Sequence, residues 1–250
     1  MKKNIICIGN FDKWSKFYDT IYHGYKEDIE FYKKEAKKVN GKVLEIACGT
    51  GRIYLELLKE GIDAYGVDIS QGMLNVLKEK TKKLGLKPKV YRADCKNFEL
   101  KHKFSLIIFP FSSFLINLTT DDQIKTLKNI KEHLLPNGKF ILDFFLPNPE
   151  FIVKNYGKEI KKIIKTKECK FVSINKSYFI DEPDQIVEFT GTLIKDSNVI
   201  WRDKIRIAFI YKREFELLLR SVGFKNWKVY GDSYYKTLKS SEQRMFWVVQ

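Results

Sequence analysis

Residues 43–52 read VLEIACGTGR, and this stretch decides the fold that the sequence predicts. Its first five residues form a short apolar run bounded by glycines, which is typical of a strand buried on both faces. A turn with two glycines follows at residues 48–51, and residues 52–58 have the apolar spacing of a helix that stops at Gly61. The stretch therefore predicts a strand, a glycine turn and a helix in direct succession.

The same alternation continues on both sides of this stretch. Strands of parallel sheets are joined by helices, so the pattern predicts a doubly wound, mainly parallel, Rossmann-like α/β sheet of seven strands. The remaining strands are expected at residues 64–67, 89–92, 106–109, 139–145, 227–230 and 244–249, and helices at 27–39, 71–84, 121–135 and 212–222, with a turn at 136–138.

The pattern changes after residue 149, where short alternating runs at 171–174, 186–189 and 205–207 are separated by turn residues. These runs predict an antiparallel β insert after strand five rather than another crossover. We expect one domain over residues 1–250, with an N-terminal helical cap at 1–42 and an insert at 150–211 that acts as a substrate lid. The last two strands are close enough in sequence to pair as a hairpin.

The chain has 250 residues, is 44% hydrophobic and carries a net charge of +15. Its length and apolar content suit one domain with a large core. The positive charge suggests a nucleic-acid partner, but only seven of the 46 basic residues are Arg, and the excess is spread almost evenly along the chain. Lysines on solvated helix faces explain this pattern better than a dedicated polyanion surface. A nucleic-acid partner therefore stays open but is not favoured.

Cysteine and histidine are sparse and scattered. The four cysteines include no CxxC pair, and Cys7, Cys48, Cys95 and Cys169 stand far apart, which indicates a reducing, cytoplasmic location. The three histidines, His23, His102 and His133, have no neighbours at metal-ligand spacing, so we expect no metal. No apolar run reaches about 18 residues, so we expect no membrane association. The sequence does not indicate an oligomeric state.

Three signals fall at the carboxyl edge of the predicted sheet, where parallel sheets bind ligands. Gly49 and Gly51 let the backbone pass close to a ligand before a helix begins. Asp68 ends the second strand and can accept hydrogen bonds from both hydroxyls of a ribose. Asp94 and Cys95 end the third strand and can face the edge of an adenine ring. Together these signals predict an adenosine site.

Five motifs in this order resemble those of the class I S-adenosylmethionine-dependent methyltransferases. They are VLEIACGTGR (43–52), YGVDIS (65–70), RADCKNF (92–98), FSLIIFPFSSF (104–114) and LLPNGKFILDFF (134–145). The resemblance implies that the cofactor is S-adenosyl-L-methionine and that the reaction is methyl transfer to a nitrogen or oxygen of a small-molecule acceptor.

The resemblance also assigns roles to single residues. Glu45, Ala47, Gly49 and Gly51 would hold the methionine part of the cofactor, with Glu45 near its amino group. The ribose would lie on Asp68, the adenine between Ile69, Met73, Asp94 and Cys95, and Phe109 would close the site near the sulfonium. Tyr22, with Tyr18, either covers the cofactor or caps the first helix, and Arg52 either neutralises the cofactor carboxylate or is solvated.

The acceptor side is less well defined. Ser112, Ser113 and Asn117 follow strand four and are candidates for acceptor contacts, while Tyr178, Trp201, Arg202 and Tyr211 are candidates for a lid. The sequence identifies no catalytic residue, although Asp143 is a candidate base at the end of strand five. Methylation of base amino groups is disfavoured because Phe109-Pro110-Phe111-Ser112 stands where an Asn/Asp-Pro-Pro-aromatic run is expected. Cysteine catalysis is disfavoured because no cysteine follows a proline.

Three alternatives to small-molecule methylation remain. The charge favours an RNA or protein methyltransferase, and a cofactor-binding protein without catalysis would have the same motifs. A nicotinamide dehydrogenase is disfavoured because Tyr54 stands where the third glycine of a Gly-x-Gly-x-x-Gly turn would lie.

Overall fold

The computed structural model describes residues 9–22, 24–166 and 169–250, so Cys7 and His23 lie outside the described residues. A seven-stranded sheet forms the centre, in the order β10-β11-β5-β4-β1-β2-β3. All its strands run parallel except β11, which is antiparallel to both β5 and β10. The strands are β1 (Val43–Ile46), β2 (Ala64–Asp68), β3 (Lys89–Arg92), β4 (Phe104–Phe109), β5 (Leu134–Phe145), β10 (Trp227–Tyr230) and β11 (Arg244–Val249). The predicted fold class is confirmed.

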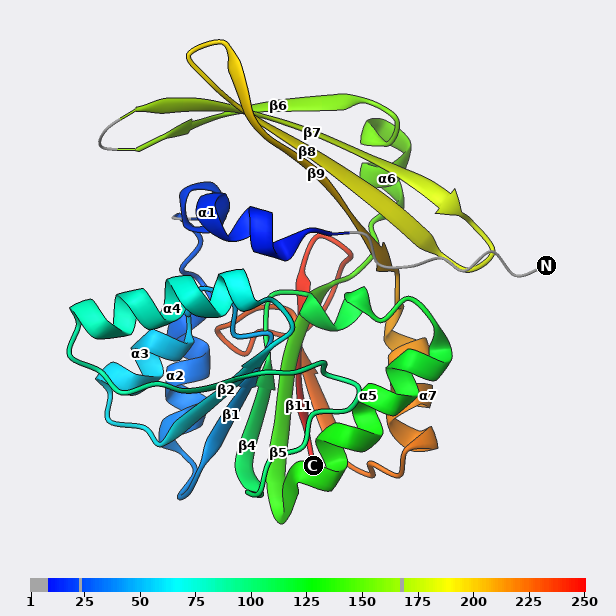
Figure 1. Ribbon diagram of the computed structural model, residues 1–250. Helices are drawn as coiled ribbons and strands as arrows, with labels where there is room; N and C mark the ends of the chain where they lie inside the picture. The colour runs from blue at the N-terminus through cyan, green and yellow to red at the C-terminus, as the bar shows by residue number, and fades with distance from the viewer. Residues whose placement is uncertain (1–8, 23, 167–168) are drawn as a thin grey trace.

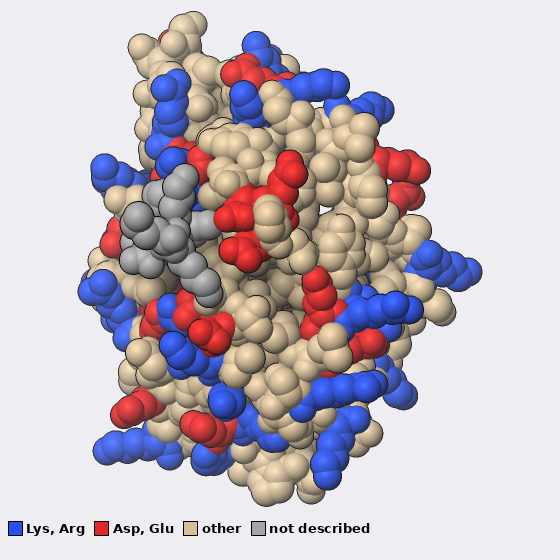
Figure 2. Space-filling model, turned by 90° about the vertical axis from the view of Figure 1, so that its right-hand side faces the viewer, with Lys and Arg blue, Asp and Glu red and all other residues tan. Residues whose placement is uncertain are grey.

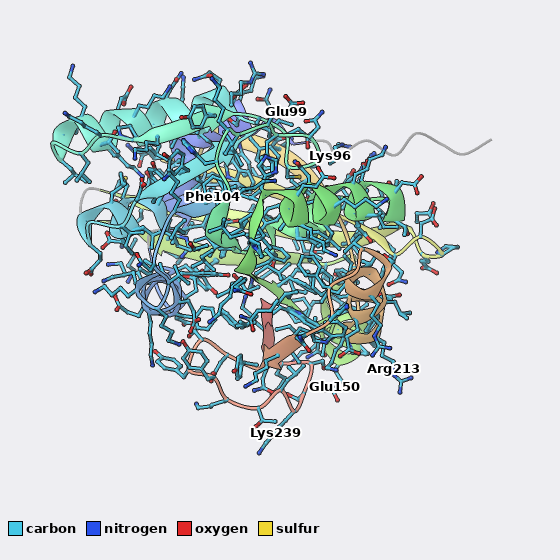
Figure 3. All side chains as sticks on the ribbon, turned by 90° about the horizontal axis from the view of Figure 1, so that it is seen from below. Lys96, Glu99, Phe104, Glu150, Arg213 and Lys239 are labelled. Carbon is cyan, nitrogen blue, oxygen red and sulfur yellow. The ribbon has the colours of Figure 1, made fainter. Side chains whose placement is uncertain are left out.

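Helices cover both faces of this sheet. Looking from below, α5 and α7 lie on one side, and α2, α3 and α4 lie on the other (Figure 3). This covering explains why all four residues of β1 are buried and apolar apart from Glu45. The helices are α2 (Ile29–Lys37), α3 (Tyr54–Lys59), α4 (Gln71–Lys83), α5 (Thr120–His133) and α7 (Lys212–Ser221), with a short 3₁₀ helix η1 (Ser113–Ile116).

A second, four-stranded antiparallel sheet lies over the carboxyl end of the parallel strands, and helix α1 (Phe11–Tyr22) runs between the two sheets (Figure 1). The second sheet fits the predicted insert after strand five. Its strands follow one another in chain order: β6 (Glu159–Lys165), β7 (Lys170–Asp181), β8 (Ile186–Lys195) and β9 (Asn198–Ala208).

One local expectation was wrong, and one helix was missed. The predicted turn at residues 136–138 is a bulge inside β5, because Phe104 pairs with Leu134 but Leu106 pairs with Lys139. The extra residues bend the strand without ending it. The helix α6 (Pro149–Asn155) was not expected; Asn148 caps it by accepting a hydrogen bond from the Phe151 N–H, at 3.0 Å. None of the described helices is long and apolar enough to cross a membrane.

Candidate active site

A cavity of about 1020 Å³ lies between the two sheets, at the carboxyl ends of β1, β2 and β4. The chain order of the strands reverses here, since β2 and β4 flank β1, and such a point is where open α/β sheets bind ligands. The insert strands β7, β8 and β9 and helix α1 form the opposite wall. Nine of the twelve residues predicted to bind the cofactor line this cavity: Tyr22, Ala47, Gly49, Asp68, Ile69, Met73, Asp94, Cys95 and Phe109.

Asp68 is fixed at the end of β2 by two backbone groups. The Gly49 N–H donates to its Oδ2 and the Ser70 N–H donates to its Oδ1, each at 2.8 Å. Burial raises the pKa of this carboxyl, and the two N–H groups partly oppose the rise. Each carboxylate oxygen accepts more than one hydrogen bond, so Asp68 retains acceptor capacity toward the cavity. Its geometry suits the recognition of a pair of hydroxyls.

The turn after β1 uses its two glycines differently. Gly49 has a φ of +54°, and a Cβ placed there would meet only the Ala47 carbonyl oxygen, at 3.9 Å. Gly51 has a φ of +90°, and its Cβ would lie 3.0 Å from side-chain atoms of Leu55 and Leu77. Gly49 therefore leaves open space at the cavity wall, whereas Gly51 lies behind the wall and lets the helices pack closely.

Glu45 also lies behind the wall, and one of its two carboxylate oxygens has no hydrogen-bond partner in the described part of the chain. It is 3% exposed, and its Oε2 is buried without a partner. Burial raises the pKa of this carboxyl well above its ordinary value, although the positive charge of Arg52 opposes the rise. A buried carboxylate without a partner is unfavourable unless a cation binds it. The residue therefore fits the amino group that the resemblance places beside it.

We expect Glu45→Gln to stabilise the protein without cofactor and to weaken cofactor binding. The pKa of Glu45 is higher in the folded protein than in the unfolded chain. The folded state therefore loses stability as the pH rises from the unfolded pKa toward the folded pKa, because the buried carboxyl must then become charged. The free energy of unfolding of the variant should exceed that of the wild type by about 1–3 kcal/mol at pH 8 and by little at pH 4. Chemical denaturation at the two pH values measures this difference.

The control for this experiment is Glu56→Gln, which replaces a partly exposed carboxylate on the neighbouring helix α3 that pairs with Lys59. It should leave stability and affinity for S-adenosylhomocysteine nearly unchanged. If Glu45→Gln bound S-adenosylhomocysteine as tightly as the wild type, Glu45 would have no role in the cofactor site.

Arg52 lies outside the cavity and forms a buried ion pair. Its guanidinium donates to both carboxylate oxygens of Asp28, which is fully buried, with Nη2 at 2.8 Å from Oδ2. The guanidinium carbon also lies 5.1 Å from the centre of the Tyr25 ring and 4.9 Å from that of Phe111. The structure thus gives Arg52 a protein carboxylate as its partner, an arrangement that neither sequence alternative included.

The adenine end of the predicted site combines apolar and polar groups. Met73 is buried, whereas Ile69 is 49% exposed and forms part of the cavity rim. Asp94 is held by the Lys96 N–H, which donates to its Oδ1 at 2.9 Å. Lys96 also lines the cavity, and it lies with Glu99 on the segment that leads from β3 to Phe104 (Figure 3). Burial raises the pKa of the Cys95 thiol to about 12, so this thiol is not a nucleophile.

Helix α1 supplies wall residues that the sequence interpretation missed, chiefly Asp12 and Trp14. The Asp12 Oδ1 accepts hydrogen bonds from the Ser70 hydroxyl and the Gly72 N–H, each at 2.6 Å, at the start of α4. A Cβ on Gly72 would lie 2.8 Å from the Asp12 backbone, so glycine is needed for this approach. The aromatic residues at 11, 14, 18 and 22 recur at helical spacing, and this signal could have identified the helix.

The insert closes the cavity against α1. The Trp14 and Trp201 rings stack with centroids 5.7 Å apart and an interplanar angle of 15°, and the Asn10 N–H donates to Asp203 Oδ2 at 2.9 Å. Of the predicted lid candidates only Trp201 lines the cavity. The others lie elsewhere: Tyr178 donates to Glu188, Arg202 contacts Thr192, and Tyr211 is exposed at the start of α7.

The three polar residues after β4 reach the cavity, but Asp143 does not. Ser112, Ser113 and Asn117 line the wall, as expected for acceptor contacts. Asp143 is fully buried, lies outside the wall, and accepts hydrogen bonds from Tyr32, from the Phe111 N–H and from Arg244. A carboxylate occupied in this way is poorly placed to take a proton from an acceptor, so the structure does not support Asp143 as the base.

Within the described residues, no group of three or more His, Cys, Asp or Glu side chains could hold a metal ion. The cavity wall is instead built from backbone turns, carboxylates and aromatic rings. Together with the sheet order, this arrangement fits the Rossmann-like architecture that the five motifs predict. Residues 43–138 match the family model described as a methyltransferase domain.

Comparisons with known proteins agree with this assignment. The chain is 29% identical over 136 residues to the dTDP-3-amino-3,4,6-trideoxy-alpha-D-glucopyranose N,N-dimethyltransferase of Streptomyces venezuelae, a match that covers 50% of this chain and 54% of that protein. The fold of the present chain is similar to that of the CcbJ methyltransferase from Streptomyces caelestis. The TM-score is 0.81 at 20% identity, and the match covers 96% of this chain and 97% of CcbJ.

A second similar structure is CalS10, described as an amino pentose methyltransferase from Micromonospora echinaspora. The TM-score is 0.72 at 15% identity, with 93% and 95% of the two chains covered. The matches to the curated relatives cover 54–64% of the relatives' own lengths. The resemblance predicted from the motifs is confirmed.

Proposed function

We propose that this protein transfers a methyl group from S-adenosyl-L-methionine to a nitrogen of a small-molecule acceptor, and that an amino sugar is the class to test first. The observation that carries the proposal is a pair of carboxylates, Asp68 at the end of β2 and Glu45 on β1 behind the cavity wall. Asp68 is held by two backbone N–H groups beside Gly49, and one carboxylate oxygen of Glu45 lacks a partner. These groups match the ribose and the amino group of one cofactor.

The residues of the cavity, and Glu45 behind its wall, have separate tasks in this mechanism. Asp68 would hold the ribose, Glu45 the amino group, and Met73 with Asp94 the adenine. When bound, the cofactor supplies a methyl group on a positively charged sulfur that is already activated for in-line displacement. The protein's part is then to align the acceptor and exclude water, for which the two sheets and α1 provide the enclosure. No dedicated base is required for this alignment.

The amino-sugar proposal is supported by the cavity and by the activities for which two similar proteins are named. The cavity has room for an acceptor beside the cofactor, and polar side chains at its β4 end, Ser112, Ser113 and Asn117, suit a hydroxyl-rich molecule. One curated relative is named for an N,N-dimethyltransferase of an amino sugar, and one similar structure is described as an amino pentose methyltransferase. Transfer to an oxygen of such an acceptor is the neighbouring alternative.

We further propose that the insert at 150–211 and the cap at 1–42 act together as the lid over this cavity. Both contribute wall residues, and the Trp14–Trp201 stack and the Asn10–Asp203 hydrogen bond join them. An acceptor that enters between the sheets would have to pass these contacts.

The RNA and protein alternatives rest on the charge of the chain. On the face shown in Figure 2, Lys and Arg lie around the periphery and Asp and Glu gather nearer the middle. This face therefore does not carry one continuous basic surface, which is what a polyanion partner would favour.

A methyl-transfer panel with radiolabelled S-adenosylmethionine tests the function. It should include free and nucleotide-linked amino sugars, amino acids, phenols, bulk RNA and protein. We expect the highest incorporation with an amino sugar. Incorporation into RNA with a steep dependence on salt concentration would favour the RNA alternative.

Calorimetry completes the test. Tight binding of S-adenosylhomocysteine without turnover on any acceptor would indicate a non-catalytic protein. Binding of NADH in place of S-adenosylhomocysteine would indicate a dehydrogenase, and would contradict the proposal entirely.

A further inference from the structure

The turn that follows β4 holds two consecutive residues in a left-handed conformation. Phe111 has a φ of 62° and Ser112 a φ of 60°, although neither is glycine. Side chains other than glycine rarely adopt this region, and such residues persist only where surrounding contacts determine them. Both residues line the cavity. The contacts that hold this turn therefore determine the shape of the cavity wall.

One buried residue accepts hydrogen bonds from both backbone N–H groups of the turn. Asp143, on β5, is fully buried. The Phe111 N–H donates to Asp143 Oδ1 at 2.8 Å, and the Ser112 N–H donates to the backbone carbonyl of Asp143 at 2.9 Å. The Tyr32 hydroxyl also donates to Oδ1, at 2.6 Å, from helix α2. The carboxylate thus connects the turn to a helix on one face of the sheet.

Arg244, on β11, completes this arrangement. Its Nε donates to Asp143 Oδ2 at 3.0 Å, its Nη2 contacts the same oxygen, and Nη2 also donates to the Ser112 hydroxyl oxygen at 2.8 Å. Because the Ser112 oxygen accepts from Arg244, its own proton remains able to donate toward the cavity. Arg244 therefore fixes the orientation of a cavity hydroxyl while it neutralises Asp143.

Two aromatic rings and two guanidinium groups surround the ring of Phe111. Tyr22 and Tyr25 lie with ring centroids 5.1 Å and 4.8 Å from it. The guanidinium carbons of Arg52 and Arg244 lie 4.9 Å and 5.8 Å from its centre. A ring enclosed in this way has little freedom to move into or out of the cavity.

The location of the turn links it to the reacting end of the site. Strand β4 pairs with β1, with Glu45 opposite Ile108, so the end of β4 lies beside the turn that carries Ala47 and Gly49. In the proposed function that part of the site holds the methionine end of the cofactor, next to the methyl group. The turn therefore borders the place where the acceptor must lie.

We propose that Asp143 and Arg244 are positioning residues that hold the Phe111–Ser112 turn and thereby align the acceptor for methyl transfer. This inference rests on the proposed function. Neither residue need touch the acceptor, since both act through the turn. An error of about 1 Å in alignment can lower a rate about 100-fold, so the effect should be on the acceptor step rather than on cofactor binding.

The test compares Asp143→Asn with Glu35→Gln. Glu35, also buried, bonds Tyr235 and Lys38 and does not touch the turn. We expect Asp143→Asn to lower kcat/KM for the best amino sugar of the panel about 30-fold or more, and to change the Kd of S-adenosylhomocysteine less than about threefold. Glu35→Gln should change both values less than about twofold. Arg244→Gln should behave like Asp143→Asn.

A second readout does not depend on turnover. Amide hydrogen exchange at Phe111 and Ser112 should be at least about tenfold faster in Asp143→Asn than in the wild type, and unchanged in Glu35→Gln. If Asp143→Asn does not fold, Tyr32→Phe, which removes a single donor to the carboxylate, should show smaller changes in the same direction.

The outcomes separate this inference from the proposed function. An inactive wild type on every acceptor would overturn the proposed function and this inference with it. An active wild type with an equally active Asp143→Asn, or with unchanged exchange at the turn, would overturn the positioning role alone.

Discussion

Replacing Asp68 with Asn is expected to weaken the binding of S-adenosylhomocysteine about 100-fold or more. A hydrogen bond to a charged group contributes about 1.5–3 kcal/mol, and in the proposed site this carboxylate accepts two from a ribose. Both carboxylate oxygens of Asp68 accept from backbone N–H groups, of Gly49 and of Ser70. In Asn one of these oxygens becomes an NH₂ group, which cannot accept, so one of the two hydrogen bonds is lost. Binding should therefore be lost together with the conformation of the turn. Isothermal titration calorimetry measures the change directly.

The matched control is Asp63→Asn, just before the opposite end of the same strand. Asp63 is exposed and pairs with Lys42 and Lys89, far from the cavity. Its replacement should leave the affinity within about twofold, because an exposed ion pair contributes about 0–1 kcal/mol to stability and none to this site. Equal affinities for wild type and Asp68→Asn would remove the ribose assignment and with it the main support for the proposed cofactor.

Replacing Arg52 with Met is expected to lower the free energy of unfolding by about 3–5 kcal/mol. Asp28 is fully buried, and Arg52 is its bidentate partner. Burial already raises the pKa of Asp28, and Arg52 opposes that rise. Removing one member of a buried pair leaves an uncompensated charge, which is the costly case. Urea denaturation at pH 7 measures the loss.

The double variant Asp28→Asn, Arg52→Met distinguishes a structural pair from a ligand site. It should recover most of the lost stability, because no unpaired charge remains. A stable Arg52→Met whose only defect is a weaker Kd for S-adenosylhomocysteine would instead mean that Arg52 binds the cofactor, as one sequence alternative proposed.

Local sequence patterns predicted the parallel sheet well. The bounds of β3, β10 and β11 were predicted to the residue, because each is a short run that contains β-branched or aromatic residues and lies between turn residues. The bulge in β5 was missed because Pro136, Asn137 and Gly138 are turn residues in most contexts. Here, pairing with β4 on both sides of the bulge keeps the strand continuous. Tertiary pairing overrode the local preference.

The residues that meet at the strand ends were also predictable from the sequence, whereas the long-range contacts around them were not. Asp68 ends β2, and Gly49 and Asp94 follow β1 and β3. Because the carboxyl ends of parallel strands meet at one edge of the sheet, the position of each residue along the chain is sufficient to place it at that edge. The partners of Arg52 and Asp143 are 24 and 101 positions away, and no local pattern identifies them. The same holds for the stack of Trp14 on Trp201, because Trp14 lies on helix α1 and Trp201 on strand β9 of the second sheet.

The hydrogen bond between Asn10 and Asp203 spans 193 positions, so its two partners are synthesised at very different times. Ribosomes release the chain from its N-terminus, so β1, β2 and β4 can form their edge long before β9 exists. Helix α1 then has only half of its final surroundings, with α4 present and the second sheet absent. The contacts that join the N-terminal segment to the second sheet, at Trp201 and Asp203, can therefore form only after residue 203 has left the ribosome.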